Sequence, residues 1–404
     1  MAFVDFLKSG HKPTLFSAFV YSDMSFMAWV LLGPLAVHIG LDLELTPEQQ
    51  YSLVALPLLA GALLRLPVGV LVDRCGPRRT GLWCQVLVMA ALALAYAFEI
   101  HSIGALYALG MALGVAGTSM AVALPLVSRW YPDQYQGLAL GVAGAASSGT
   151  VFAALLAPVL AQSYGWRSVL GLALIPLGLA FLLYRFGAQD YPQPRQPQRL
   201  ARYLTVLADP DAWWFMLFYA VAFGGVVALA SVLVLYFYQQ YHIAPASAGY
   251  FAAACVLAGS VLRPAGGWLA DRWGGIRSLQ MLYALVAASL LAASFSPADV
   301  LYGMALLMAA MAGLGMASGA VFQLAPLRFR NSVGATTGLI GVAGGLGGFA
   351  WAELLGKSKL LSGGFQSGFL IFAGLALMCL WGVRRVRTRW RTTWGSAAST
   401  SARV

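Results

Sequence analysis

The feature that most constrains the fold of this chain is a succession of apolar stretches, each about twenty residues long. Hydrophobic residues make up 60% of the sequence and charged residues only 10%, a composition far from that of soluble globular domains. About twenty apolar residues in an α-helix span the ~30 Å hydrocarbon layer of a bilayer. We therefore predict an all-α membrane protein with twelve transmembrane helices, at residues 14–37, 51–72, 81–99, 104–128, 136–160, 167–187, 213–240, 247–270, 277–296, 299–324, 332–356 and 365–384.

Basic residues are distributed unevenly over the loops between these predicted helices. With the N-terminus inside, the cytoplasmic segments hold twenty Lys and Arg residues, whereas the outer loops hold only Arg167, Lys357 and Lys359. Cytoplasmic loops of membrane proteins carry such an excess. We therefore expect both termini in the cytoplasm and a location in the cytoplasmic (bacterial inner) membrane. The same bias explains the net charge of +11 without a nucleic-acid partner, and the basic stretch 384–391 is expected to contact anionic lipid headgroups.

A segment rich in Pro, Gln and Arg divides the predicted helices into six and six. We expect residues 188–212 to form a cytoplasmic linker between an N-terminal half at 1–187 and a C-terminal half at 213–384, with a basic cytoplasmic tail at 385–404. The halves repeat one another, because Arg65 and Gly69 recur as Arg263 and Gly267, 198 residues later. Halves of equal orientation are related by an axis along the membrane normal. Equivalent positions should then face each other across a central pathway.

Two arginines lie deep inside predicted membrane helices. Arg65 and Arg263 each precede the Asp of an Asp-Arg pair, Asp73 and Asp271, by eight residues. At ~1.5 Å of rise per residue, both guanidinium groups come to lie near the bilayer midplane. An arginine there costs ~2.5–3.5 kcal/mol, which makes it a functional candidate. Because a guanidinium is a planar fork of N–H donors, two opposed forks suit a small planar oxyanion.

Other candidate groups inside the predicted helices are few. Asp23 lies in the first helix and Glu353 in the eleventh. Asp23 is a candidate proton carrier, with a partner for a buried donor as the alternative; for Glu353, a surface pair with Lys357 is expected. The four cysteines stand at unrelated spacings and the four histidines near helix ends. We therefore expect neither a metal site, nor disulfides, nor a cofactor.

The predicted loop after the second helix carries a recognisable motif. GVLVDRCGPRR, residues 69–79, resembles the signature of the major facilitator superfamily in that loop, and GGWLADRWGGIR, residues 266–277, is a degenerate copy after the eighth helix. The resemblance implies the twelve-helix, two-half fold of that superfamily. Charge clusters of this kind hold one conformation and break in the other. The residues we assign to this conformational switch are Gly69, Asp73, Arg74, Gly76, Arg78, Asp271 and Arg272.

Within that superfamily, the chain resembles the nitrate/nitrite porter family. The resemblance covers most of the length, through DMSFMAWVLLGPL (23–35), LPLLAGALLRLPVGVLVDRCGPRR (56–79), FYAVAFGG (218–225), VLRPAGGWLADRWGG (261–275) and GLIGVAGGLGG (338–348). It implies that Arg65 and Arg263 bind the anion, that Tyr219 hydrogen-bonds it, and that Phe223 lies one turn further along. It also implies that glycine-rich stretches line or hinge the pathway. Their candidate residues are Gly144, Gly341 and Gly345.

One position departs from the family pattern. The family usually carries Gly-Asn where this sequence has Ala146-Ser147. A serine hydroxyl still donates a hydrogen bond, but it offers one donor where an amide offers two. Ser147 is therefore a candidate anion ligand whose presence leaves the nitrate-versus-nitrite preference open, with plain helix packing as the alternative.

These features predict a secondary transporter that moves nitrate and/or nitrite by alternating access, as a monomer. Both nitrate/nitrite exchange and proton-coupled nitrate uptake remain open at this stage. A transporter of another small anion, such as a carboxylate or a phosphate ester, is the nearest alternative, and a non-transporting membrane sensor is an alternative of another class. An intramembrane enzyme is disfavoured, because the sequence has no HExxH motif and no ligand-spaced Cys/His cluster.

Overall fold

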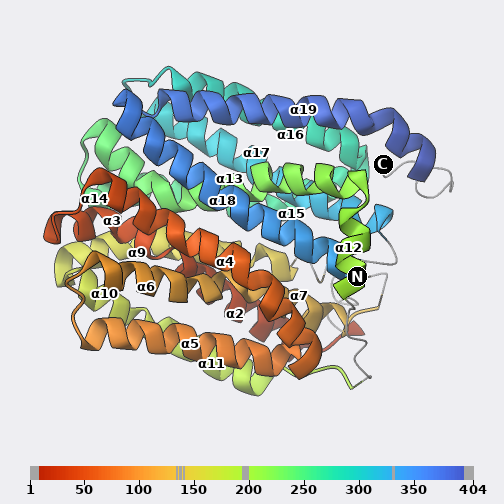
Figure 1. Cartoon of the computed structure of the whole chain (residues 1–404), viewed down its shortest axis with the longest axis horizontal. Helices are drawn as coiled ribbons and strands as arrows, with labels where there is room; N and C mark the ends of the chain where they lie inside the picture. Colours follow the sequence, from red (N-terminus) through yellow and green to blue (C-terminus); the bar gives the residue numbers. More distant parts are fainter. Residues whose placement is uncertain are drawn as a thin grey trace.

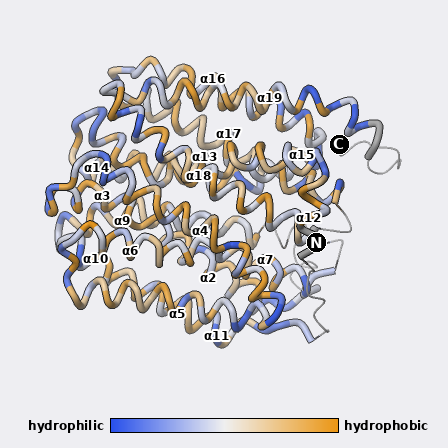
Figure 2. Tube along the Cα trace, in the orientation of Figure 1, coloured by the Kyte–Doolittle hydropathy of each residue, from blue (hydrophilic) through white to orange (hydrophobic). Residues whose placement is uncertain are grey.

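The protein is a bundle of long helices that lie side by side (Figure 1). The computed structural model describes residues 9–132, 135, 139, 142–192, 200–329 and 333–394. Within these residues, twelve helical segments are long and apolar enough to cross a membrane, as the sequence predicts. Hydrophilic residues gather toward the two ends of the bundle and hydrophobic residues lie between them (Figure 2). The chain is thus an integral membrane protein with an all-α architecture.

The first six spans occupy the lower part of Figure 1. Their elements are α2 (Lys12–Val30) with α3 (Leu32–Asp42), α4 (Pro47–Cys75), α5 (Pro77–Ala97), α6 (Ile103–Leu113) with the 3₁₀ turn η1 (Gly114–Thr118) and α7 (Ser119–Ser128), η2 (Ala145–Ser148) with α9 (Gly149–Tyr164), and α10 (Trp166–Leu172) with α11 (Leu174–Gly187). Residues 136–138 and 140–141, where the fifth span was predicted to begin, lie outside the described residues.

The last six spans occupy the upper part of Figure 1. They are α13 (Pro210–Tyr241), α14 (Pro245–Val261) with α15 (Arg263–Trp273), α16 (Gly275–Ser294), α17 (Val300–Arg328), α18 (Val333–Ser362) and α19 (Gln366–Trp394). Helix α18 packs against both α13 and α4, so it joins the two sets of six helices where they meet.

The fourth span is interrupted by the 3₁₀ turn η1, and glycines explain its position. A Cβ atom on Gly117 would collide with the indole ring of Trp29, and one on Gly114 would collide with Ala60. Without these glycines, η1 would not approach α2 and α4 so closely. A 3₁₀ turn also changes the hydrogen-bond pattern of the helix, and the carbonyl of Gly117 accepts side-chain hydrogen bonds from α4.

The predicted linker and the predicted basic tail both contain helix. Within the predicted linker 188–212, residues Leu200–Leu207 form the short helix α12, and α13 already begins at Pro210. Helix α19 runs to Trp394, ten residues beyond the end of the last apolar run. The extension is stable because Val386 and Trp390, one turn apart, are both buried, and the Trp390 ring stacks on Phe215 at 4.8 Å. The part of the expected basic tail that the structure describes therefore continues helix α19.

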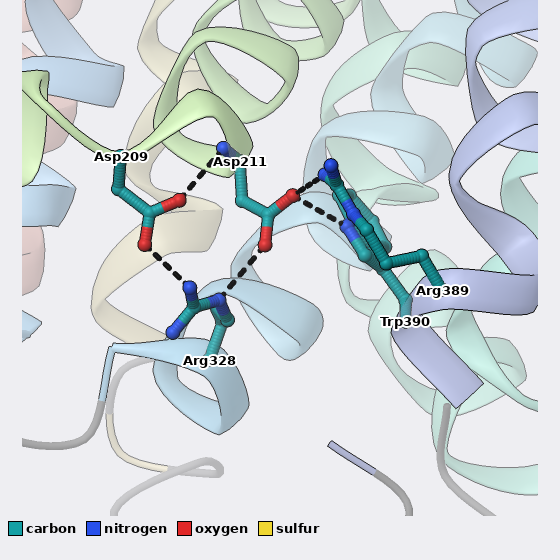
Figure 3. Close-up of polar contacts among 5 residues, drawn as sticks. All are labelled: Asp209, Asp211, Arg328, Arg389 and Trp390. Atoms are coloured by element: carbon teal, nitrogen blue, oxygen red, sulfur yellow. Dashed lines mark hydrogen bonds and ion pairs between the residues drawn. The ribbon is translucent and has the colours of Figure 1, made fainter. Parts of the chain in front are cut away.

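A cluster of charges ties the extension of α19 to the start of α13 (Figure 3). Asp209 caps α13 by accepting from the backbone N–H of Asp211 at 2.8 Å. Arg328, the last residue of α17, donates to Asp209 at 2.5 Å and to Asp211 at 2.9 Å. From α19, the Trp390 indole donates to Asp211 at 2.8 Å, and Arg389 pairs with the same carboxylate. One buried carboxylate thus joins the ends of three helices.

Candidate functional site

Arg65 is buried in the middle of α4 and uses its donors on backbone carbonyls. Its Nε and Nη2 each donate to the carbonyl of Gly117 in η1 at 3.2 Å, and its Nη1 donates to the carbonyl of Gly341 in α18. Because a buried guanidinium must be hydrogen-bonded, these carbonyls account for its stability at this depth. Gly117 belongs to the first six spans and Gly341 to the last six, so this side chain bridges them.

Arg263 occupies the corresponding position in the other half and is only partly hydrogen-bonded. It is the first residue of α15, directly after the break that separates α14 from α15. Its Nη2 donates to the hydroxyl of Tyr219 at 3.0 Å. Its Nη1 is buried and has no hydrogen-bond partner among the described residues. Leaving a buried donor unpaired is costly, so this atom is a natural position for an acceptor to bind.

The ring of Phe223 lies close to both arginines. The Cζ atoms of Arg65 and Arg263 are each 5.4 Å from its centroid, so the two guanidinium carbons are no more than twice that distance apart. Tyr219 stacks on Phe223 with centroids 5.0 Å apart and an interplanar angle of 6°. The aromatic face attracts both cations and thereby offsets part of their mutual repulsion. The structure thus brings together the four side chains Arg65, Arg263, Tyr219 and Phe223.

Two further aromatic residues complete the surroundings, and the sequence analysis missed both. The ring of Trp29 in α2 lies 5.8 Å from the Cζ of Arg65. The ring of Phe322 in α17 lies 5.9 Å from the Cζ of Arg263 and packs edge-on against Tyr219 at 4.8 Å. Aromatic residues are common in apolar helices, so the sequence contains no signal that distinguishes these two.

The glycines of α18 provide space for the site. A Cβ on Gly341 would lie 3.0 Å from the Nη1 of Arg65, and a Cβ on Gly344 would lie 2.6 Å from the ring of Tyr219. Gly345 instead faces α4, where its Cβ would lie 2.7 Å from that of Ala62. Of the two predicted glycines, Gly341 therefore contacts a site arginine and Gly345 lies at a helix contact. Gly344 is the neighbour of Tyr219 that the sequence analysis did not single out.

The candidates on the fifth span lie further from the arginines. The carbonyl of Ser147 accepts from the hydroxyl of Ser260 at 3.1 Å, one turn before Arg263. No hydrogen bond joins Ser147 to either arginine among the described residues. Gly144 has open space where a Cβ would stand, and nothing is described for the side chain of Ala146. Ser147 and Gly144 therefore stay predictions, with no hydrogen bond from Ser147 to the arginines in the described part of the chain.

Asp23 has a hydrogen-bonding partner on the same fifth span. It is 4% exposed and accepts from the hydroxyl of Ser148 at 2.7 Å. The partner is thus the second serine of the pair, the neighbour of Ser147. Asp23 thus accepts a hydrogen bond from a partly buried hydroxyl, and it stays a candidate for proton transfer.

Most residues of the predicted switch lie around the ends of α4 and α15, with Arg78 at the start of α5 and Gly69 two turns inside α4. Gly76 and Gly274 have φ angles of 94° and 90°, which L-residues with a side chain rarely adopt, so both loops need glycine at the helix end. The backbone N–H of Arg78 donates to Asp190 at 3.1 Å. In the second copy, Asp271 accepts from Gln323 at 3.1 Å.

The remaining switch residues lie beside these turns. Gly69 has open space where a Cβ would stand. Asp73 and Arg74 lie in the last turn of α4, and Arg272 contacts the ring of Trp268 at 5.4 Å. Repeated positions in the two halves thus occupy equivalent places at helix ends.

Comparison with known proteins identifies the family of this chain. The model of the Major Facilitator Superfamily matches residues 16–352. The chain is 31% identical to the "Nitrite extrusion protein" of Bacillus subtilis over 87% of this chain and 88% of that protein. It is 30% identical to a "Probable nitrate/nitrite transporter" of Mycobacterium tuberculosis over 91% of this chain and 95% of that one. The chain belongs to the nitrate/nitrite porter family of the major facilitator superfamily.

Further comparisons support this placement of the porter. It is 31% identical to a "Probable nitrate/nitrite antiporter" of Thermus thermophilus, over 89% of the porter and 88% of the relative. Its fold resembles that of a bacterial homologue of the human lysosomal transporter Spinster, with a TM-score of 0.69 and 16% identity over 92% of the porter and 96% of that chain. The family and relatives are transporters, so the porter is not an enzyme.

Proposed function

We propose that this porter moves nitrate and/or nitrite across the cytoplasmic membrane by alternating access, with the anion bound between Arg65 and Arg263. The names of its relatives support the choice of substrate. The main observation that supports this location of the anion site is the Nη1 of Arg263, which is buried beside the Tyr219 hydroxyl without a hydrogen-bond partner among the described residues. A planar oxyanion satisfies that donor and accepts from the phenol at the same time.

The contacts of Arg65 suggest how binding is coupled to movement. Its guanidinium donates to Gly117 in one half and to Gly341 in the other. An anion that enters competes with these carbonyls for the same N–H groups. Binding therefore exchanges a contact between the halves for a contact with substrate, and a ligand shifts a conformational equilibrium only through such differential interactions.

The two positive charges of Arg65 and Arg263 make the closed state less stable in the empty carrier than in the loaded carrier. Around them lie aromatic rings and buried backbone, where electrostatic interactions are stronger than in water. A bound anion reduces the repulsion between the arginines and stabilises the closed state. A carrier of this kind crosses loaded more readily than empty, and the similarity to the nitrate/nitrite antiporter of Thermus thermophilus supports exchange.

The proposal also includes the orientation of the protein in the membrane, its oligomeric state and its coupling to protons. The excess of basic residues in one set of loops supports cytoplasmic termini, and a single twelve-span chain with a central site supports a monomer. Asp23 is the candidate for proton coupling, because it is an acid buried in the first span.

Nitrate uptake into proteoliposomes that contain the purified porter tests this function. Vesicles are loaded with nitrite or left empty, with and without an inward proton gradient. Uptake that requires internal nitrite establishes exchange, whereas uptake into empty vesicles driven by the gradient establishes proton symport, which Asp23→Asn then tests. Phosphate, formate and acetate serve as competitors, and absence of nitrate and nitrite transport under all conditions refutes the proposal.

A further inference from the structure

A basic groove lies on the outer side of the bundle, away from the arginine pair. It has a volume of about 720 Å³ and lies between α16 and the extension of α19. It is lined by Gln280, Arg384, Arg387, Thr388 and Arg391. The end of α19 reaches the side of the bundle where the two termini lie (Figure 1).

The extension of α19 presents two different faces. Arg384, Arg387 and Arg391 follow one another at intervals of three and four residues, so they share one face of the helix. Arg389 lies on the opposite face and Trp390 lies between the two faces, and both bind Asp211 (Figure 3). The contacts with Asp211 therefore hold the extension in place and present the three arginines to the groove.

No acid among the described residues neutralises the charge of the groove. No ion pair joins Arg384, Arg387 or Arg391 to an acid among the described residues. Arg391 instead has Arg387 and Arg277 as like-charged neighbours, and its Nε is buried without a hydrogen-bond partner in the described part of the chain. Several cations held together without an acid bind an anion, and guanidinium forks bind phosphate well.

The surface next to the groove indicates where that phosphate comes from. On α16, Met281 directly follows Gln280 and is 53% exposed; on α19, Trp381 lies one turn before Arg384 and is 60% exposed. Exposed apolar side chains continue along both helices, at Leu285, Leu377 and Met378. In a membrane this strip faces acyl chains, so a phospholipid can place its phosphate in the groove and its chains along the strip.

We infer that the groove between α16 and α19 binds the headgroup phosphate of an anionic phospholipid. The apolar strip favours a lipid over a soluble phosphate compound, because only a lipid covers both surfaces. Each basic residue at a membrane surface strengthens the binding of anionic lipid by about fivefold. Removing two arginines of the groove is therefore expected to weaken binding about ten- to thirtyfold.

The test measures thermal unfolding of the purified full chain in detergent while phosphatidylglycerol is added. The variant Arg387→Gln/Arg391→Gln removes two charges from the groove. The matched control Arg79→Gln/Arg385→Gln removes two exposed arginines at the same end of the bundle. Phosphatidylcholine, inorganic phosphate and glycerol phosphate are titrated in parallel.

We expect phosphatidylglycerol to stabilise the wild type and the control at similar concentrations, and the groove variant to need about ten- to thirtyfold more. An equal response of all three proteins overturns the inference, because the groove arginines then do not contribute to lipid binding. Equal weakening of the groove variant and the control also overturns it, because the effect is then one of general charge. Stabilisation by inorganic phosphate or glycerol phosphate as strong as that by lipid also overturns it, in favour of a soluble anion.

A second variant separates loss of charge from loss of fold. Arg387→Lys/Arg391→Lys keeps both charges and is expected to keep the lipid response within about threefold. Loss of the response in the lysine variant contradicts a site that acts through charge. None of these measurements depends on transport, so the inference stands or falls independently of the substrate.

Discussion

Arg263→Lys is the sharpest test of the proposed anion site. In the structure Arg263 donates to Tyr219 through Nη2 and has Nη1 buried and unpaired. A lysine keeps the charge but replaces the planar fork by a single ammonium group. It cannot serve the phenol and a bound oxyanion with the same geometry, so we expect the loss of one charge-assisted hydrogen bond. Such a bond contributes about 1.5–3 kcal/mol, which corresponds to a loss of about ten- to 150-fold in kcat/KM.

The assay is nitrate uptake into nitrite-loaded proteoliposomes with equal amounts of reconstituted protein. Arg385→Lys, at an exposed position of α19, is the control and should keep activity within about twofold of wild type. Arg65→Lys should lower both transport and thermal stability, because Arg65 also donates to the carbonyls of Gly117 and Gly341. Arg263→Lys should affect mainly transport. Full activity of Arg263→Lys would refute the bidentate model.

Three further predictions follow from contacts around the site and at the helix ends. Tyr219→Phe removes the acceptor of Arg263 Nη2 and leaves a buried donor unpaired, so we expect nitrate transport to fall about five- to 100-fold; wild-type KM and kcat would contradict this. Gly344→Ala brings a Cβ within 2.6 Å of the Tyr219 ring and should cost about 1–3 kcal/mol in stability, whereas Gly374→Ala, where the space is open, should melt like the wild type. Asp211→Ala removes the acceptor of Arg389 and Trp390 in α19 and leaves Arg328 in α17 with Asp209 alone, and it should cost about 2–3 kcal/mol; an unchanged melting temperature would show that these contacts contribute nothing to stability.

The sequence predicted the architecture because membrane helices follow a simple rule. A long apolar stretch must form a helix in lipid, since its backbone groups find no water. The same rule made Arg65 and Arg263 conspicuous, and the internal repeat placed them in equivalent positions. The structure brings both to the ring of Phe223.

The rest of the site depends on packing that a pattern of residue types does not contain. Phe322 and Trp29 are apolar residues in apolar helices, so nothing in the sequence distinguishes them. The carbonyl of Gly117 accepts from Arg65 within a 3₁₀ turn, and which carbonyl is available cannot be read from composition. Ser147 and Ser148 are adjacent, and only the orientation of the helix decides that Ser148 contacts Asp23.

The end of the last transmembrane helix illustrates the same difficulty at the membrane edge. Hydropathy ends near residue 384 because basic residues follow, yet α19 continues to Trp394. Charged residues at a membrane edge are expected from topology alone. The buried face formed by Val386 and Trp390 becomes evident only once α13 lies beside it.

The course of α19 also has a practical consequence for shortening the protein. A chain cut after residue 384, where hydropathy ends, would lose Arg389 and Trp390 and leave the carboxylate of Asp211 with Arg328 as its remaining side-chain partner among those described. Asp211 stands at the start of α13, the helix that carries Tyr219 and Phe223 two and three turns further on. Purification tags and fluorescent reporters therefore belong after residue 394, where they leave undisturbed the helix that carries Tyr219 and Phe223.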